Sequence, residues 1–391
     1  MIVGVPKETF PGERRVALVP LVVPSLAKAG LQVIIESGAG AEAGYPDALY
    51  AEKGAKVIPD RASVFQQADI IAQVLCHGAN DRTGSADLPL LRRDQALVGF
   101  QRPLGAKDAV EQIAATGAMA FAVELMPRTT RAQSMDALSS MATVAGYKAT
   151  LIGADALPKF LPMLTTAAGT VTPARVLVIG AGVAGLQAIA TARRLGAVVS
   201  GYDLRPAVKE QVQSLGARFV ELPLDTGDAQ DARGYAKAQD ETFYARQRDL
   251  MGRVIAEQDL VITTAVVPGK KAPVLVTAPM VYGMAAGSVI VDLAAERGGN
   301  CELTRAGETV VDRGVTIIGR INLAGSVPFH ASQLYARNLT AFLLLLVKDG
   351  KLNLNFQDDI VRETLLTRGG EVANARVREF FGLPALAAQA S

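Results

Sequence analysis

One stretch, residues 176–203 (VLVIGAGVAGLQAIATARRLGAVVSGYD), constrains the fold more than any other part of the sequence. A run of branched apolar residues leads into the spacing G-x-G-x-x-G, with glycines at Gly180, Gly182 and Gly185, and a helical pattern follows. This order of strand, glycine turn and helix is typical of the phosphate-binding unit of a Rossmann domain. We expect the first glycine to permit the tight turn, the second to let a pyrophosphate approach the backbone, and the third to let helix and strand pack closely.

An acidic residue stands where such a domain binds the adenosine ribose. Asp203 ends the next predicted strand, 23 residues after Gly180. A carboxylate at this position accepts hydrogen bonds from the ribose hydroxyls and repels a 2′-phosphate, so the pattern favours NAD(H) over NADP(H). The nearby Arg205 weakens this argument for NAD(H), because an arginine at such a position can accommodate the 2′-phosphate of NADP(H).

Strand and helix patterns alternate in two blocks, which is typical of parallel sheets with helices on both faces. Residues 134–157 and 330–348 read as two long helices between or after the blocks, and residues 349–391 are expected to return to the first block. We therefore predict an α/β protein with two Rossmann-like, doubly wound parallel-sheet domains, joined by long helices with a cleft between them. The predicted N-terminal domain comprises residues 1–136 and 328–391, and the predicted NAD(H)-binding domain comprises residues 137–327. In the first block the predicted strands are 2–5, 32–36, 68–74 and 118–124; in the second they are 175–180, 197–203, 218–222, 259–265 and 288–294.

Composition excludes several classes of function. The 40 basic and 38 acidic residues nearly cancel, which argues against nucleic acid as a ligand. Only two cysteines and two histidines are present, so we expect no disulfide, no metal site and no histidine-based acid–base chemistry. We expect no signal peptide, and apolar runs such as residues 339–347 are too short to cross a membrane, which needs roughly 20 residues. A membrane role would therefore depend on partners.

Residues 223–250 form a polar segment between a predicted strand and the next helix. Connections in such folds usually have about 2–6 residues, so this one is long. It is either a solvated surface loop or a lid over the bound nucleotide, with Tyr235 at its tip.

The chain resembles a known family over nearly its whole length. Residues 4–20 (GVPKETFPGERRVALVP) and 36–55 resemble the shared N-terminus of alanine dehydrogenases and proton-translocating transhydrogenases. Residues 124–149 (ELMPRTTRAQSMDALSSMATVAGYKA), and above all their RAQSMD run, resemble the transhydrogenases specifically; so do residues 166–197, GGNCEL (298–303) and RGYAKA (233–238). No stretch of this sequence resembles the membrane helices of that family, so we expect the split form, in which other chains carry them.

The resemblance implies a function, partners and site residues. It implies the NAD(H)-binding subunit of a transhydrogenase, a homodimer in the cytoplasm that is held at the inner membrane by an NADP(H)-binding subunit and a membrane-spanning proton channel. Arg128 and Asp136 would orient the nicotinamide end, Gln133 would reach toward the partner's NADP(H), and Tyr235 would close over the nucleotide. The residues expected at the nucleotide are Arg128, Thr129, Thr130, Arg131, Gln133, Asp136, Ser139, Gly180, Gly182, Val183, Gly185, Asp203, Leu204, Arg205, Gly234, Tyr235, Ala265 and Val266.

The chemistry separates this function from two alternatives. An amino-acid dehydrogenase needs a cation for the carboxylate of its substrate and an acid–base group; in the resembling dehydrogenases a lysine and a histidine serve. This chain retains Arg15 but has Gln73 at the lysine position and no histidine in residues 97–106, although a shifted alignment would bring in His77. Direct hydride transfer between two nicotinamides needs mainly positioning. A dehydrogenase and a non-catalytic NAD-binding regulator remain the alternatives.

Overall fold

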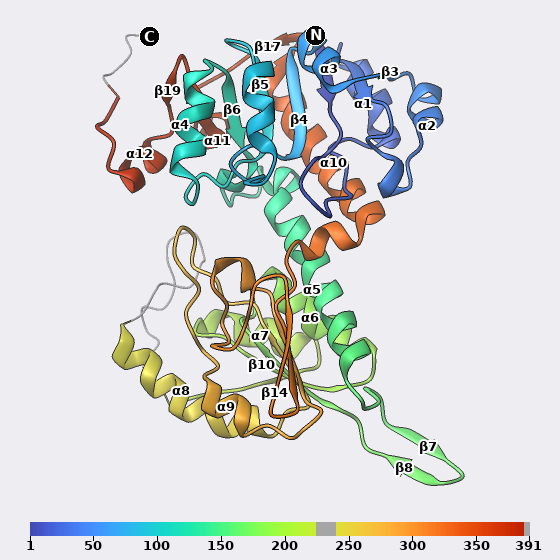
Figure 1. Cartoon of the computed structure of the whole chain (residues 1–391), viewed down its shortest axis with the longest axis vertical. Coiled ribbons are helices and arrows are strands. Elements are labelled where there is room, and N and C mark those ends of the chain that lie inside the picture. The colour runs from blue at the N-terminus through green and yellow to red at the C-terminus, as the bar shows by residue number, and fades with distance from the viewer. Residues whose placement is uncertain (224–239, 387–391) are drawn as a thin grey trace. The chain divides into compact units, whose positions relative to one another are not determined.

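The computed structural model describes residues 1–223 and 240–386, and these divide into two units. The first unit comprises Met1–Met141 and Gly325–Ser391, and the second comprises Ala142–Ala324. The elements of each unit can be followed in Figure 1. Among the described residues, no helix is both long enough and apolar enough to span a membrane.

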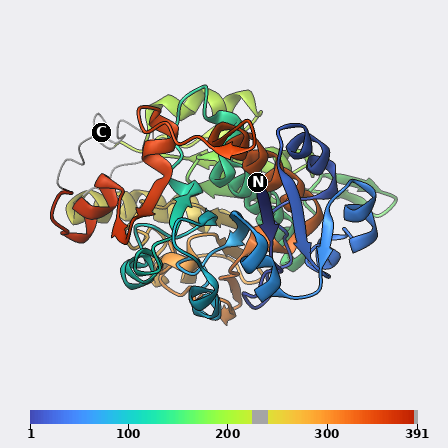
Figure 2. The same cartoon turned by 90° about the horizontal axis from the view of Figure 1, so that it is seen from above.

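The first unit is built on a sheet of eight strands in the order β19-β18-β6-β5-β4-β1-β2-β3. Strands β1 to β6 are parallel, whereas β18 pairs antiparallel with β6 and β19 antiparallel with β18. Figure 2 shows the C-terminal segment, in red, within the unit that the blue N-terminal strands begin. The strands are Ile2–Val5 (β1), Gln32–Glu36 (β2), Lys56–Ile58 (β3), Ile70–Leu75 (β4), Ala96–Phe100 (β5), Met119–Ala122 (β6), Leu365–Arg368 (β18) and Glu371–Val372 (β19).

Helices connect these strands and cover the sheet. The buried apolar residues of the long helix α10, among them Ala331, Tyr335, Leu339, Phe342 and Leu346, recur at helical spacing, so one face of the helix is buried in this unit. The helices are Val23–Lys28 (α1), Asp47–Glu52 (α2), Arg61–Gln67 (α3), Lys107–Ala115 (α4), Pro328–Leu346 (α10), Asp359–Thr364 (α11) and Ala375–Phe381 (α12).

The second unit contains a sheet of seven strands in the order β11-β10-β9-β12-β13-β15-β14, parallel except for β14. Its central strands are rich in valine and isoleucine and buried on both faces, as expected where helices cover a parallel sheet. The strands are Arg175–Ile179 (β9), Val198–Tyr202 (β10), Arg218–Phe219 (β11), Leu260–Thr263 (β12), Val289–Asp292 (β13), Thr309–Asp312 (β14) and Val315–Ile318 (β15).

The helices of the second unit are Val183–Arg194 (α6), Lys209–Ser214 (α7), Glu241–Ala256 (α8) and Ala278–Tyr282 (α9). Helix α5 (Ala137–Ala156) runs across the boundary between the two units. A hairpin of Leu164–Thr166 (β7) and Gly169–Val171 (β8), not predicted from the sequence, projects from the second unit in Figure 1.

The parallel strands of the two sheets have the same order. If only the parallel strands of each unit are numbered along the chain, their order across the sheet is 3-2-1-4-5-6 in both units. The order reverses between the first and fourth strands, β1 and β4 in one unit and β9 and β12 in the other. Ligands of doubly wound folds bind outside the carboxyl ends of the strands at this point, so each unit offers one candidate position.

Candidate functional site

The glycine turn of the second unit lies at its reversal point, between the carboxyl end of β9 and the start of α6. Gly180 has a φ of +97°, which an L side chain rarely adopts, and its N–H donates to the Tyr202 carbonyl at 2.7 Å. A β-carbon on Gly185 would lie 1.8 Å from the Gly180 carbonyl oxygen. The turn and the helix therefore pack as closely as the sequence predicts, and the close contact requires glycine at this position.

Gly182 forms the open side of the turn. It is the N-cap of α6, no side chain caps the helix there, and helix residues begin with Val183. A β-carbon on Gly182 would meet no atom closer than 4.0 Å. Backbone amides at a helix N-terminus bind anions, so this side of the turn suits a pyrophosphate.

Asp203 is placed beside the turn, directly after β10. Its Oδ2 accepts the Ala181 N–H at 2.7 Å, which ties the end of the second strand to the turn after the first. Arg205 binds the same carboxylate through Nε at 2.9 Å and Nη2 at 2.8 Å, and through its backbone N–H at 2.9 Å. Asp203 and Arg205, which were expected to influence the ribose site separately, therefore bind each other directly. Leu204, between them, is half-buried.

The loop after β12 contains the predicted contacts Ala265 and Val266. Asn300 holds this loop, because its Oδ1 accepts the Ala265 N–H at 2.9 Å and its Nδ2 donates to the carbonyls of Ala265 at 2.8 Å and Pro273 at 2.9 Å. Thr264 joins the loop to the glycine turn by donating its hydroxyl to the Gly180 carbonyl at 2.9 Å.

Asp292, at the end of β13, holds Asn300 in place by accepting its backbone N–H. Its buried carboxylate accepts hydrogen bonds from the backbone N–H groups of Ala294, Asn300 and Cys301 and from the hydroxyls of Thr263 and Thr304, at 2.7–3.0 Å. Asp292 and Asn300 were not predicted as supports of the site. Two features of the sequence could have indicated them, namely an aspartate at the end of a predicted strand and the GGNCEL run.

The segment that carries Arg128 to Ser139 belongs to the first unit. Asp136 caps α5, because its carboxylate accepts the Ser139 N–H at 2.8 Å and the Ser139 hydroxyl at 2.6 Å. Five of the predicted residues in this segment have exposed side chains, namely Arg128, Thr129, Thr130, Arg131 and Gln133.

Arg131 is engaged within the first unit. Its guanidinium binds Asp358 at 2.5–2.6 Å and also Asp359, both at the start of α11. Hydrogen bonding to Arg131 lowers the pKa of Asp358 to about 2. Arg131 therefore has two carboxylate partners that the sequence analysis did not anticipate.

Some of the predicted site lies outside the described residues. Gly234, Tyr235 and most of the predicted lid belong to this segment of the chain. Residues 241–250 form the start of helix α8, so the polar connection is shorter than the 223–250 expected from the sequence.

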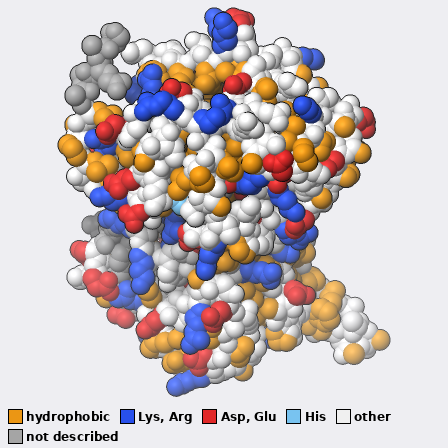
Figure 3. All heavy atoms as spheres, turned by 45° about the horizontal axis from the view of Figure 1, so that its top comes forward, with side chains coloured by type: hydrophobic (Ala, Val, Ile, Leu, Met, Phe, Trp, Pro, Cys, Tyr) orange, Lys and Arg blue, Asp and Glu red, His pale blue; other side chains and the backbone are white. Residues whose placement is uncertain are grey.

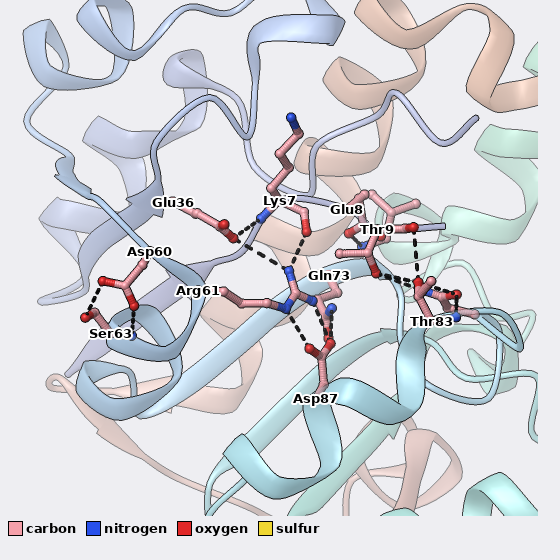
Figure 4. A network of polar contacts seen from close by, with 12 residues as sticks. Lys7, Glu8, Thr9, Glu36, Asp60, Arg61, Ser63, Gln73, Thr83 and Asp87 are labelled. Carbon is pink, nitrogen blue, oxygen red and sulfur yellow. Dashed lines mark hydrogen bonds and ion pairs between the residues drawn. The ribbon is translucent and has the colours of Figure 1, made fainter. Parts of the chain in front are cut away.

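The first unit has a similar acidic contact at its own reversal point (Figure 4). Glu36 ends β2, and its Oε2 accepts the N–H of Lys7, the second residue after β1, at 2.8 Å. Asp203 follows β10 and accepts the N–H of Ala181, the second residue after β9, in the same way. Arg61 lies 3.6 Å from Glu36, and thus an arginine accompanies the strand-end acid in both units.

In the first unit this position is filled by the chain's own side chains. Figure 4 shows Arg61 between Glu36 and Asp87, and Arg61 Nε and Nη2 each bind Asp87 at 2.6 Å. Gln73 donates to the same Asp87 at 3.0 Å. The carboxylate of Glu8 accepts the N–H groups of Val74 and Leu75 at 2.6 and 3.1 Å. No glycine turn or immediate helix follows β1, so the features that suit a pyrophosphate are confined to the second unit among the described residues.

Arg15, which a keto-acid site would need, forms a buried ion pair. Its Nη2 lies 2.5 Å from Glu13 Oε2 and its Nε donates to Glu13 Oε1 at 2.8 Å, and the two side chains are only 4% and 0% exposed. An acidic partner so close cancels the positive charge that would attract a substrate carboxylate.

Glu8 makes the stability of the chain depend on pH. Burial, with a smaller effect of Glu13, raises the pKa of Glu8 from 4.5 to about 8. The folded state holds this proton more tightly than the unfolded state does. The protonated Glu8 side chain therefore contributes fully to the stability of the folded state below pH 4.5, and this contribution is lost as the pH rises to about 8. We expect the free energy of unfolding, measured with urea, to fall by roughly 4 kcal/mol more over this range in the wild type than in Glu8→Gln. In the control Glu52→Gln, which changes an exposed residue, the free energy of unfolding should fall with pH as in the wild type. An equal fall in the wild type and in Glu8→Gln would contradict the prediction.

Comparison with known proteins agrees with this geometry. The fold and the glycine turn define a dinucleotide-binding α/β protein with two doubly wound units. The N-terminal domain model of the alanine dehydrogenase/PNT family matches residues 4–145 and the C-terminal domain model matches residues 149–375. The chain therefore belongs to the alanine dehydrogenase/PNT family.

Relatives of two kinds match nearly the whole chain. The first of the chains that make up the alpha subunit of the NAD(P) transhydrogenase of Rhodospirillum rubrum is 44% identical over 377 residues, which cover 96% of this chain and 98% of that protein. The crystal structure of a transhydrogenase from Sinorhizobium meliloti has a TM-score of 0.82 at 42% identity, and covers 96% of this chain and 100% of that one. An L-alanine dehydrogenase structure has a TM-score of 0.80 at 28% identity, and covers 98% of this chain and 99% of that one.

Basic and acidic side chains are interspersed over the face of the described residues shown in Figure 3. This mixture agrees with the nearly balanced charge of the sequence.

Proposed function

We propose that this chain is the NAD(H)-binding subunit of a proton-translocating NAD(P) transhydrogenase. The observation that carries the proposal is full-length similarity to the alpha-subunit chain of the Rhodospirillum rubrum transhydrogenase, at 44% identity over 96% of the chain. The glycine turn and Asp203 suit a dinucleotide. Membrane-spanning and NADP(H)-binding partner subunits would complete the enzyme, and the chain would lie in the cytoplasm beside the inner membrane.

A bound NAD(H) would supply the hydride to, or accept it from, NADP(H) on the partner subunit, and the hydride transfer itself would need no acid or base from this chain. The chain would have to position its nicotinamide ring at a reacting distance of about 3–3.5 Å from the nicotinamide ring on the partner. The glycine turn and α6 would hold the pyrophosphate, and the loop fixed by Asn300 would hold Ala265 and Val266 against the nucleotide. Arg128 and Asp136 would orient the nicotinamide end, Gln133 would reach toward the partner, and Tyr235 would close over the site. Thr129, Thr130, Arg131, Ser139 and Gly234 complete the proposed contacts.

An amino-acid dehydrogenase is the second candidate, because the fold matches an L-alanine dehydrogenase with a TM-score of 0.80. Two contacts of the first unit argue against it. Arg15 is paired with Glu13 in a buried ion pair, and Gln73, which replaces the lysine of the dehydrogenases, binds Asp87. Neither residue presents a positive charge to a keto acid.

Stopped-flow mixing tests the proposal. The purified chain is loaded with NADH and mixed with the NADP⁺-loaded partner subunit, with buffer, or with pyruvate and ammonia. We expect rapid hydride transfer only with the partner. Gln133→Asn should slow it by about tenfold with unchanged NADH affinity, whereas Gln66→Asn on the exposed face of α3 should have no effect. NADH oxidation by pyruvate and ammonia would establish a dehydrogenase instead, and NADH binding without either reaction would establish a regulator.

We also propose that the chain forms a homodimer, and the hairpin of β7 and β8 offers a surface for a second copy. Residues 160–174 contain no charged residue, and Phe160, Met163 and Val171 are 59%, 63% and 41% exposed. Exposed apolar residues gathered on a ribbon mark interaction surfaces. We expect light scattering to give a dimer for the wild type and a monomer for Met163→Lys with Val171→Lys, while Val311→Lys on β14 should leave the dimer intact. A wild-type monomer would refute the homodimer.

A further inference from the structure

The two oxygens of Asp203 already have four hydrogen-bond donors. Oδ1 accepts the backbone N–H and Nε of Arg205, and Oδ2 accepts Nη2 of Arg205 and the N–H of Ala181, at 2.7–2.9 Å. A carboxylate offers about four lone-pair sites. The hydroxyls of an adenosine ribose can therefore bind Asp203 only if they share or displace the guanidinium donors of Arg205.

The guanidinium also lies next to the glycine turn. Its Nη2 is 4.0 Å from the position that a β-carbon would take on Gly182, and the Arg205 and Asp203 side chains are only 13% and 6% exposed. A bidentate pair with so little contact with water is screened weakly. The positive charge of Arg205 thus opposes the negative charge of Asp203 at the place where the ribose and the phosphates of a dinucleotide would lie.

We propose that Arg205 is a specificity-determining residue that partly neutralises Asp203 and so weakens the discrimination of this site against a 2′-phosphate. The inference rests on the proposed NAD(H)-binding function. With NADH, the two ribose hydroxyls replace Nε and Nη2 at Asp203, and the guanidinium turns to the neighbouring pyrophosphate. With NADPH, the guanidinium remains between the carboxylate and the 2′-phosphate, where one cation is shared by two anions.

Removing the guanidinium should then change the two affinities unequally. In Arg205→Met the side chain keeps most of its length but has neither charge nor donors, so Asp203 faces the 2′-phosphate without a counter-charge. NADPH binding should weaken by about tenfold or more, while NADH binding changes by less than about threefold, because NADH loses a pyrophosphate contact but gains an unoccupied Asp203. Arg205→Lys keeps the charge without the planar fork and should lie between the wild type and Arg205→Met.

The test is the ratio of the dissociation constants for NADPH and NADH, measured on the purified full chain by the fluorescence of the reduced nicotinamide. Lys209→Met is the matched control, since it removes a nearby cation that pairs with Glu221 and does not touch Asp203. We expect the ratio to rise about tenfold in Arg205→Met and to stay within about twofold of the wild type in Lys209→Met.

An unchanged ratio in Arg205→Met, or no detectable NADPH binding to the wild type at millimolar concentration, would overturn the inference and leave the proposed function intact. If Arg205→Met fails to fold, Arg205→Lys carries the test: a raised ratio supports the inference and an unchanged ratio overturns it. Failure of the wild type to bind NADH would instead overturn the proposed function itself.

Discussion

Replacing Gly185 by alanine should abolish tight binding of NAD(H), with the dissociation constant raised by at least about 100-fold. The added β-carbon would lie 1.8 Å from the Gly180 carbonyl oxygen and 2.8 Å from its carbon. Both atoms belong to the backbone and cannot rotate away, so α6 must shift from the turn and carry the amides of its first turn with it. Isothermal titration with NADH would measure the loss.

A second glycine-to-alanine change supplies the control. Gly252 lies inside helix α8, and a β-carbon there would have no neighbour closer than 3.9 Å. Gly252→Ala should leave NADH binding unchanged and stabilise the chain by up to about 1 kcal/mol, because alanine favours the helix. Wild-type affinity in Gly185→Ala would show that the turn does not hold the nucleotide.

Replacing Asp292 by asparagine should destabilise the chain by about 3 kcal/mol or more. The fully buried carboxylate accepts five hydrogen bonds, and an amide turns one acceptor into a donor that faces donors. At least one buried N–H would then lack a partner. Unfolding in urea would measure the loss.

Asp312→Asn is the matched control for this variant. Asp312 ends β14, is only half-buried, and has a single long contact of 3.4 Å to the Tyr282 hydroxyl. We expect its substitution to change the free energy of unfolding by less than about 0.5 kcal/mol. Equal stability of Asp292→Asn and the wild type would show that the five hydrogen bonds contribute little. NADH affinity should also fall in Asp292→Asn, because Asn300 loses its support.

Most of the central parallel strands could be predicted because their residues are apolar without interruption, but β5, which is equally apolar and buried, was not predicted. Strand β9 ends one residue before the predicted bound of 175–180, and helix α6 follows the glycine turn directly. Strands β14 and β15 were not predicted, because β14 is a half-exposed strand at the edge of the sheet and β15, although it is mostly buried between β13 and β14, has only four residues. Strands β18 and β19 were also not predicted, because both are short: β18 has four residues between β6 and β19, and β19 has two residues at the edge of the sheet.

The side-chain partners in the site could not be predicted. Arg131 pairs with Asp358, 227 residues away, and nothing local in the sequence indicates that contact. Arg15 is close to Glu13 in sequence, but only their burial together shows that the positive charge is cancelled. Asp203 and Arg205 were both identified from the sequence, whereas the bidentate contact between them depends on the rotamer of a long side chain.

The two units also differ in whether they are formed by one continuous segment of the chain. The second unit is one continuous stretch, Ala142–Ala324, whereas the first combines Met1–Met141 with Gly325–Ser391. During synthesis from the N-terminus, the second unit can fold once residue 324 has emerged. The first unit must wait for β18 and β19, which end at Val372, to complete the edge of its sheet beside β6. Until then the backbone groups of β6 on that side are unpaired, and an unpaired strand edge is prone to aggregation. A ribosome stalled between these two points would therefore hold a finished nucleotide-binding unit and an incomplete, open-edged sheet on the same chain.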